Sequence, residues 1–381
     1  MMRKWLRLAI VRKILINNCL PRICNGRSLL LLFLFFRFQT AVFASGYRNS
    51  FTEYLNLIPD SRIAVDYGTS CPGKPVVLVL FALPNGNSIE WTAGKKMEPG
   101  DDWHFDIQHI KAQTEFVRAT DTTKQYIVAY LQASMKAWTA HAVRYNGTNG
   151  TADSYLLYPR LVDTLEQIVC RATGLPVSEV VLSSHSGGGR FMFNYISGVK
   201  EIPAKVSRLV FIDSNYGFED SLHTEKLGRW LIASTGHKLG VFSYVDTTVI
   251  FNGKRIVSSK GGTGYKTEEM SACLERALLS VEREARKSGS GTNVITPAGE
   301  KREAGYALWK FSRSADTCFV KMQSANGQVL MLKKENPQGH IYHTVLVERN
   351  GFIHSLFFNS PFEDKGYKFW IEGRAYLNFV E

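Results

Sequence analysis

The chain has 381 residues, of which 45% are hydrophobic, so it is long and apolar enough to bury a substantial core. Its formal net charge is +12, but eight basic residues and no acidic residue precede Ser45. Removing those eight from the 46 basic residues leaves 38 against 34 acidic ones, a balance of +4. No remaining basic cluster is interleaved with aromatic residues, so the composition argues against a nucleic-acid partner.

Residues 1–44 have the pattern of a targeting segment. A basic start precedes the apolar run Leu29–Phe36, and Val42–Ala44 places small side chains where a signal peptidase acts. We expect a signal peptide cleaved after Ala44, while the long basic portion and Arg37 leave an uncleaved N-terminal anchor open. The expected product is a single domain, residues 45–381, that is secreted or periplasmic. Membrane contact is expected only through the N-terminal segment, if it is uncleaved.

Four cysteines remain after this leader: Cys71, Cys170, Cys273 and Cys318. In an exported protein they permit two disulfides in any of three pairings. No C-x-x-C spacing is present, so no metal site is expected from them.

Helices and strands are predicted to alternate along the rest of the chain. The run Pro75–Ala82 is continuously apolar, as in a central strand that is covered on both faces, and it ends in a Leu-Pro-Asn-Gly turn. The other predicted strands are Arg62–Asp66, Gln125–Leu131, Val180–Ser183, Val206–Asp213 and Leu239–Asp246, with a hairpin around Asn326-Gly327. The predicted helices are Asp106–Arg118, Ser154–Thr173, Phe191–Val199, Leu227–Ser234 and Thr267–Lys287, and residues 132–151 are predicted to be a loop.

The stretch from Ser178 to Arg190 contains the most informative motif. An apolar strand stops at Ser184-His-Ser-Gly-Gly188, and a helix follows. Small residues on both sides of Ser186 allow the chain to reverse within a few residues and leave this serine exposed. The motif resembles the nucleophile elbow of the α/β-hydrolase family, with Ser184 in the place of the first glycine of G-x-S-x-G.

This resemblance implies an α/β fold with a mostly parallel sheet flanked by helices, and insertions after the strand that carries the catalytic acid. It implies that Ser186 is a nucleophile. It also implies that the backbone amide of Gly187, together with one from Asn85 or Gly86, forms an oxyanion hole; Leu83 is a further candidate.

Two aspartates are candidates for the catalytic acid, because each ends a predicted parallel strand and ligands bind outside the carboxyl ends of such strands. Asp213 ends the first strand after the elbow, and Asp246 ends the second. The resemblance favours Asp246 and leaves Asp213 as the alternative. Either carboxylate is also explained by simple capping of the strand end.

Three histidines near the C-terminus are candidates for the general base. His343 is preferred because it follows a polar loop and precedes an apolar stretch that is suited to a terminal helix. A strand-like alternation through residues 341–347 would instead make His343 a core residue, in which case His340 is the base; His354 is the third choice. His185 is excluded as a base, because adjacent residues at an elbow point apart.

Together these features predict a secreted serine hydrolase that cleaves an ester or amide bond of a small molecule or polymer through an acyl-enzyme intermediate. No cofactor and no metal are expected for this chemistry. The alternatives are a peptidase or a carbohydrate esterase on the same fold, or a secreted binding protein that keeps the fold without activity.

Overall fold

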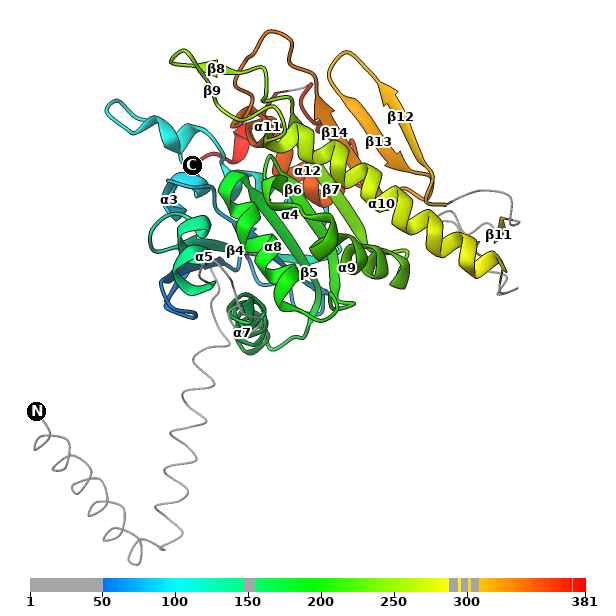
Figure 1. The fold of residues 1–381 in the computed structure, drawn as a ribbon. Coiled ribbons are helices and arrows are strands. Elements are labelled where there is room, and N and C mark those ends of the chain that lie inside the picture. The colour runs from blue at the N-terminus through cyan, green and yellow to red at the C-terminus, as the bar shows by residue number, and fades with distance from the viewer. Residues whose placement is uncertain (1–50, 147–154, 288–293, 296–300, 303–307, 372) are drawn as a thin grey trace, which may run out of the picture. The chain divides into compact units, whose positions relative to one another are not determined.

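The computed structural model describes residues 51–381 except 147–154, 288–293, 296–300, 303–307 and 372 (Figure 1). The predicted leader, residues 1–44, therefore lies outside the described residues. No helix among the described residues is long and apolar enough to cross a membrane.

A mixed ten-stranded sheet forms the centre of the domain, in the order β1-β2-β4-β3-β5-β6-β7-β14-β13-β12. The run from β4 to β14 is parallel, whereas β1, β2, β13 and β12 are antiparallel to their neighbours. The strands are β1 Phe51–Leu55, β2 Ser61–Asp66, β3 Val76–Ala82, β4 Gln125–Ala133, β5 Val177–His185, β6 Val206–Ile212, β7 Lys238–Tyr244, β12 Phe311–Ala315, β13 Val320–Ser324 and β14 Val329–Lys334. This is an α/β-hydrolase fold, as predicted.

Register in the central strands brings several loops to one edge of the sheet. Ala82 on β3 is level with Ser184 on β5, and His185 is level with Ile212 on β6. Because the strands are parallel, the loops that follow β3, β5, β6 and β7 leave the sheet at the same edge. The predicted site residues up to Asp246 therefore lie along this carboxyl edge.

Helices cover both faces of the sheet, as Figure 1 shows, with α8, α9 and α10 in front and α4 and α12 behind. The helices are α3 Ile89–Ala93, α4 Ile110–Thr120, α5 Trp138–Asn146, α7 Leu157–Thr173, α8 Gly189–Gly198, α9 Asp220–Ala233, α10 Gly262–Lys287, α11 Val345–Glu348 and α12 Gly351–Phe357. Short 3₁₀ turns are η1 Trp103–Asp106, η2 Ser186–Gly188, η3 Asn215–Gly217 and η4 Leu377–Phe379.

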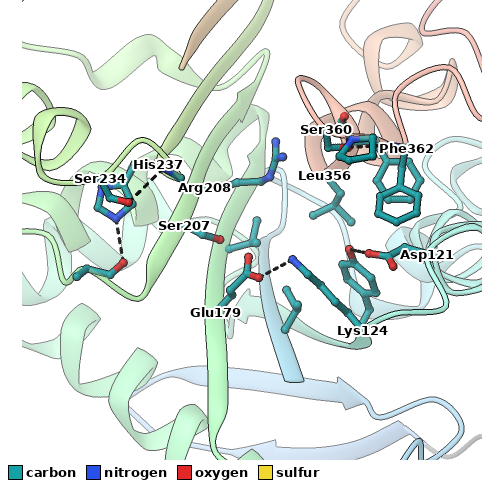
Figure 2. A pocket seen from close by; sticks show the side chains of 17 residues that line it. Asp121, Lys124, Glu179, Ser207, Arg208, Ser234, His237, Leu356, Ser360 and Phe362 are labelled. Carbon is teal, nitrogen blue, oxygen red and sulfur yellow. Dashed lines mark hydrogen bonds and ion pairs between the residues drawn. The ribbon is translucent and has the colours of Figure 1, made fainter. Parts of the chain in front are cut away.

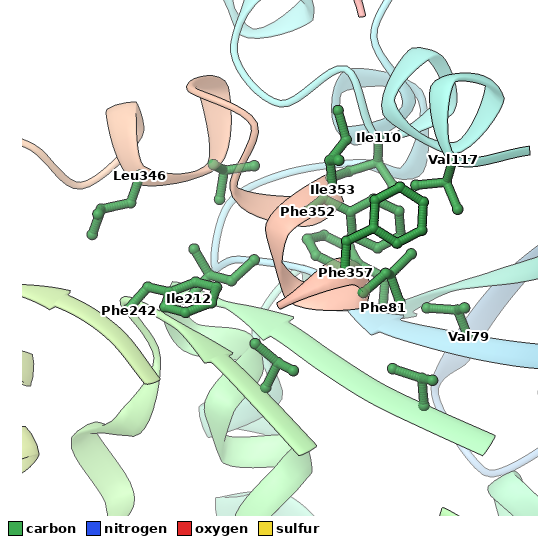
Figure 3. Close-up of a cluster of buried hydrophobic side chains, with 14 of the residues drawn as sticks. Val79, Phe81, Ile110, Val117, Ile212, Phe242, Leu346, Phe352, Ile353 and Phe357 are labelled. Carbon is green, nitrogen blue, oxygen red and sulfur yellow. The ribbon is translucent and has the colours of Figure 1, made fainter. Parts of the chain in front are cut away.

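The core behind the sheet joins α4 and α12 to the central strands (Figure 3). Every residue of β3 is buried, and alternate ones, Val79 and Phe81, face this core. Phe81 meets Phe352 of α12 edge-on, with ring centroids 5.4 Å apart. Such burial of large apolar side chains is the main stabilising contribution and anchors the C-terminal segment on the sheet.

Residues 132–151 were predicted to be a loop, but helix α5 occupies Trp138–Asn146. Trp138 is buried, its Nε1 donates to the Leu131 carbonyl over 3.0 Å, and its ring lies 4.9 Å from that of Phe191 on α8. Burial of one tryptophan therefore fixes a segment whose polar composition is typical of a surface loop.

Between β7 and β14 lie a short hairpin, β8 Ile250–Phe251 with β9 Lys254–Arg255, then α10, and then a second short pair, β10 Val294–Ile295 with β11 Lys301–Arg302. β12 and β13 follow this pair. Whether these are insertions into the fold stays a prediction. The hairpin around Asn326-Gly327 is confirmed, with Gly327 at a φ of 71°. All four described cysteines are free, so neither of the permitted disulfides is formed.

Candidate active site

Ser186 occupies a strained turn at the carboxyl end of β5. Its φ is 52°, in the left-handed region that residues other than glycine rarely adopt, and it is partly exposed while Ser184 and His185 beside it are buried. Backbone strain of this kind costs on the order of 1–3 kcal/mol and is typical of functional positions. The turn therefore presents the Ser186 hydroxyl at the carboxyl edge of the sheet.

Three glycines after Ser186 allow this turn to touch two neighbouring loops. A Cβ atom on Gly187 would lie 2.1 Å from the Asn85 side chain, and one on Gly188 would lie 2.1 Å from the Ala82 carbonyl oxygen. A Cβ on Gly189 would lie 1.6 Å from the Ser214 carbonyl oxygen. At Gly188 and Gly189 the atoms met are backbone oxygens, so only glycine fits there, and these two positions hold the elbow against the end of β3 and the loop after β6.

Ser184 departs from the usual glycine of the motif, and the structure gives the reason. Its hydroxyl lies 2.8 Å from the hydroxyl of Ser214, and the Ser214 hydroxyl donates to the Ser184 carbonyl over 3.2 Å. Both serines are buried. The Ser184 hydroxyl thus adds a side-chain contact between the nucleophile strand and the loop that carries Asp213, which a glycine could not make.

His343 and Asp213 form a hydrogen-bonded pair between Nδ1 and Oδ2. Asp213 is fully buried after β6, whereas the side chain of His343 is 30% exposed. The other Asp213 oxygen, Oδ1, accepts a hydrogen bond from the Thr263 hydroxyl at the start of α10. His343 precedes α11 rather than lying in a strand, so the alternative of a core histidine in a strand is wrong.

Asp246 lies nearby but has different partners. Its Oδ2 accepts a hydrogen bond from the Thr263 amide over 3.1 Å, and its buried Oδ1 makes no hydrogen bond among the described residues. Thr263 therefore contacts both carboxylates, through its hydroxyl and its amide. The prediction that favoured Asp246 as the partner of His343 is wrong, because the loop after β6, not the one after β7, presents its carboxylate to the imidazole.

The charges in this cluster are coupled. Burial alone would lower the pKa of His343, but the hydrogen bond to Asp213 and the charges of Asp213 and Asp246 raise it above its ordinary value. Burial, and then the neighbouring charge of Asp213, raise the pKa of Asp246 to about 7. Asp246 therefore gains or loses its negative charge near neutral pH, and this charge acts on the neighbouring imidazole of His343.

His185 contacts the backbone and the ring of His343, which the sequence did not reveal. Its Nε2 donates to the carbonyl oxygen of His343 over 3.0 Å, and the two rings lie 4.7 Å apart. Burial, and then the charge of His343, hold the pKa of His185 well below its ordinary value, so the imidazole is neutral. The prediction that His185 is not the base is consistent with this contact, in which His185 holds the backbone of His343 in place.

The other candidate histidines lie elsewhere. His340 is exposed, and its backbone is fixed by two hydrogen bonds to the Asn336 side chain, of 2.9 and 2.8 Å. His354 is buried within α12, where Nδ1 lies 3.2 Å from the Tyr367 hydroxyl. Of the three histidines, the structure brings only His343 to the predicted acids.

The loop after β3 lies against the elbow, but its amides are not equally available. The Gly86 amide donates to the Lys136 carbonyl over 2.7 Å, and the Leu83 amide donates to the Leu131 carbonyl over 3.1 Å. The prediction of Gly86 as an oxyanion donor is therefore wrong. No hydrogen bond in the described part of the chain engages the backbone amide of Asn85, and the Asn85 side chain packs against Gly187.

No group of three or more His, Cys, Asp or Glu side chains that could hold a metal ion is found among the described residues. The site around Ser186 combines a partly exposed serine, an imidazole that contacts a buried carboxylate, and backbone amides beside the serine.

No family model and no curated protein matches the sequence. Among solved structures, a thermostable esterase is 14% identical, with a TM-score of 0.40, and the match covers 80% of this chain and 61% of that one. The acetyl xylan esterase from Aspergillus awamori is 10% identical, with a TM-score of 0.38 and coverage of 75% and 93%. The siderophore hydrolase EstB from Aspergillus nidulans is 14% identical, with a TM-score of 0.38 and coverage of 83% and 95%.

Proposed function

We propose that the protein is a serine hydrolase that cleaves carboxylic esters, with Ser186 as nucleophile, His343 as general base and Asp213 as the acid that orients the histidine. The observation that carries this proposal is the hydrogen bond between His343 and the buried Asp213, at the same sheet edge as the strained, partly exposed Ser186. A serine hydroxyl is a poor nucleophile at neutral pH, and such a pair is what activates it.

The proposed reaction has two halves. His343 Nε2 takes the proton of the Ser186 hydroxyl while Oγ attacks the ester carbonyl carbon, and the carbonyl electrons move to oxygen. When the tetrahedral intermediate collapses, the bond to the alcohol oxygen breaks and His343 returns the proton to that alcohol. Water then repeats the sequence on the acyl-enzyme, releasing a carboxylic acid and restoring Ser186.

Stabilisation of the oxyanion is assigned to the amides of Gly187 and Asn85. Losing one such donor typically lowers turnover by about 100- to 1000-fold. Asp213 keeps the proton on Nδ1 of His343, which leaves Nε2 free to accept the serine proton. In the described part of the chain no hydrogen bond joins Ser186 to His343, so the proposal requires the two side chains to come within hydrogen-bond distance when substrate binds.

A fluorophosphonate probe tests the nucleophile directly, because it forms a stable adduct only with an activated serine. The wild-type protein is expected to be labelled and Ser186→Ala is not. Equal labelling of both, or labelling of neither, would contradict the proposal and favour a binding protein that keeps the fold without activity.

The substrate is proposed to be an ester of a small molecule or a polymer, and the site is proposed to need no cofactor, metal or nucleic acid. Hydrolysis of short-chain and long-chain p-nitrophenyl esters, acetylated sugars and peptides by the same preparation separates esterase, carbohydrate esterase and peptidase activity. We expect the simple esters to be cleaved fastest; faster cleavage of the peptides would contradict this choice.

Export of the protein is a separate proposal, which rests on the N-terminal pattern alone. N-terminal sequencing of the protein recovered from the medium or the periplasm is expected to begin at Ser45. Recovery only from membranes with residues 1–44 attached would instead support the uncleaved anchor, and recovery only from the cytoplasm would contradict export.

A further inference from the structure

A cavity of about 550 Å³ lies at the amino ends of the central strands, whereas Ser186 and Asp213 follow the carboxyl ends (Figure 2). Its walls come from the starts of β3 to β6, from the residues just before β7, and from the end of α12 and the segment after it. Its volume is within the range that small-molecule sites occupy, roughly 300–1000 Å³. The cavity is thus large enough for a small ligand and distinct from the proposed active site.

A bulge in β6 directs two adjacent residues into this cavity. Val206 is level with Val180 and Arg208 is level with Val181, so Ser207 is an extra residue in the register. An extra residue in a strand re-aims the side chains around it. Both Ser207 and Arg208 line the cavity, although neighbours in a regular strand face opposite sides.

Arg208 is a partly buried cation without a carboxylate partner among the described residues. One guanidinium nitrogen, Nη1, donates to the Phe358 carbonyl over 3.0 Å, and the group lies 4.7 Å from the centroid of the Phe358 ring. Its Nε and Nη2 atoms make no hydrogen bond in the described part of the chain. Burial lowers the pKa of Arg208 to about 10, so it keeps its charge at neutral pH.

The acidic residues that line the cavity already have partners. Glu179 pairs with Lys124, and the Asp121 carboxylate accepts a hydrogen bond of 2.7 Å from the Tyr126 hydroxyl. A second buried cation, Lys238, is level with Arg208 in the sheet, and its Nζ contacts only the Thr235 carbonyl among the described residues, over 3.3 Å. Arg208 and Lys238 therefore lie side by side where β6 and β7 begin, and neither makes an ion pair among the described residues.

A charge that is partly withdrawn from water and has no ion-pair partner is costly, so the presence of Arg208 points to an anion that completes the site. The buried Ser207 hydroxyl, which makes no hydrogen bond among the described residues, is a second unsatisfied group at the same place. The remaining walls are largely apolar, formed by Val77, Val181, Leu356 and Phe362. Cation, hydroxyl and apolar wall together match a carboxylate that carries an apolar tail.

We propose that this cavity binds a small monocarboxylate, with the carboxylate on Arg208 and Ser207 and the apolar tail against the walls from β3, β5 and α12. The free edge of the guanidinium, Nε and Nη2, has the geometry for two parallel hydrogen bonds to the two carboxylate oxygens. A monoanion suits the site better than phosphate, because one guanidinium and one hydroxyl do not satisfy a dianion and the apolar walls offer it nothing.

The test is calorimetric titration of the full chain with hexanoate, with the matched alcohol hexanol and with inorganic phosphate. Each titration is repeated on protein pretreated with the fluorophosphonate probe, so that binding near Ser186 is distinguished from binding in the cavity. Hexanoate is expected to bind saturably and equally well before and after treatment, with hexanol and phosphate at least about 10-fold weaker.

Arg208→Met is expected to weaken hexanoate binding by roughly 10- to 100-fold, since a hydrogen-bonded charge pair is lost. Arg229→Met, at an arginine whose side chain is 65% exposed on α9, is the matched control and is expected to bind as wild type. Removing an unpaired buried charge should leave the melting temperature of Arg208→Met unchanged or higher.

Ser207→Ala, which keeps the charge, is expected to weaken binding about 3- to 10-fold and decides the matter if Arg208→Met does not fold. The proposal is overturned if wild type binds hexanoate no better than hexanol, if phosphate binds as tightly as hexanoate, or if Arg208→Met binds like Arg229→Met. Loss of hexanoate binding after probe treatment would also overturn it, because the ligand would then occupy the proposed active site. The comparisons with hexanol, phosphate and the Arg208 variant do not depend on whether the ester hydrolase proposal is correct, whereas the comparison before and after probe treatment requires that Ser186 reacts with the probe.

Discussion

The two edges of the central sheet handle buried charge in different ways. At the carboxyl edge the Asp213 carboxylate contacts His343 and Thr263, so groups of this chain supply its partners. At the amino edge the Arg208 guanidinium finds only a carbonyl and a ring, and no carboxylate among the described residues. We propose that the first charge, which has partners within the chain, serves to act on a bound molecule, and that the second, which has no carboxylate partner, serves to hold one.

Ser186→Ala should have the largest effect and act at the carboxyl edge alone. If Ser186 is the nucleophile, its loss is expected to lower kcat for ester hydrolysis by at least about 10⁴-fold, as it does in serine hydrolases. Steady-state assays with a p-nitrophenyl ester measure this. The control is Ser312→Ala, at an exposed position on β12, which should retain wild-type activity. A Ser186→Ala protein that folds and keeps more than about a tenth of the activity would refute the assignment.

Asp213→Asn and Asp246→Asn form a matched pair that separates the two acids. Asp213→Asn removes the carboxylate that His343 contacts and is expected to lower kcat by about 10³- to 10⁴-fold. Asp246→Asn keeps the hydrogen bond from the Thr263 amide and is expected to cost no more than about 10-fold. Circular dichroism establishes that both variants fold. The reverse order of effects would restore the sequence-based preference for Asp246.

His185→Asn should reduce activity by a smaller factor, because it removes a contact to the backbone of the base rather than the base itself. Loss of the 3.0 Å hydrogen bond to the His343 carbonyl is expected to lower kcat about 10-fold with KM little changed, since only the position of the imidazole is altered. The control is His223→Asn, which alters another buried histidine. If kcat and the melting temperature fall by the same amounts in His185→Asn and in His223→Asn, His185 is merely structural.

The smallest expected change is in the pH dependence of kcat/KM, whose acidic limb should shift. His343 must be neutral to accept a proton, and its pKa is raised above the ordinary value, so kcat/KM should rise with pH through a midpoint above about 6.5. The negative charge of Asp246 contributes to that raised pKa, so Asp246→Asn should move the limb to lower pH. A shift to higher pH, or none, would contradict the coupling.

The sequence was sufficient for the features that depend on neighbouring residues. The elbow is local, because strand, small residues and helix follow one another within residues 178–199, and Ser186 was identified from them. The central strands were equally clear, since the run from Val76 to Ala82 is apolar throughout and is buried throughout.

The choice between aspartates was not accessible in this way. Asp213 and Asp246 both end parallel strands, and which one meets His343 depends on where the tail from residue 336 to residue 350 crosses the sheet edge and on Thr263 at the start of α10. The Gly86 amide is not available as an oxyanion donor, because it donates to the carbonyl of Lys136, which lies in a different loop. Such contacts between distant segments leave no trace in the spacing of one sequence.

The most direct test of the central claim combines the fluorophosphonate probe with mass spectrometry of the labelled peptides, on wild type, Asp213→Asn and Asp246→Asn. The account predicts a single adduct on Ser186, formed much more slowly in Asp213→Asn and at close to the wild-type rate in Asp246→Asn. No adduct on Ser186 in the wild type, or slow labelling of Asp246→Asn with normal labelling of Asp213→Asn, would contradict it.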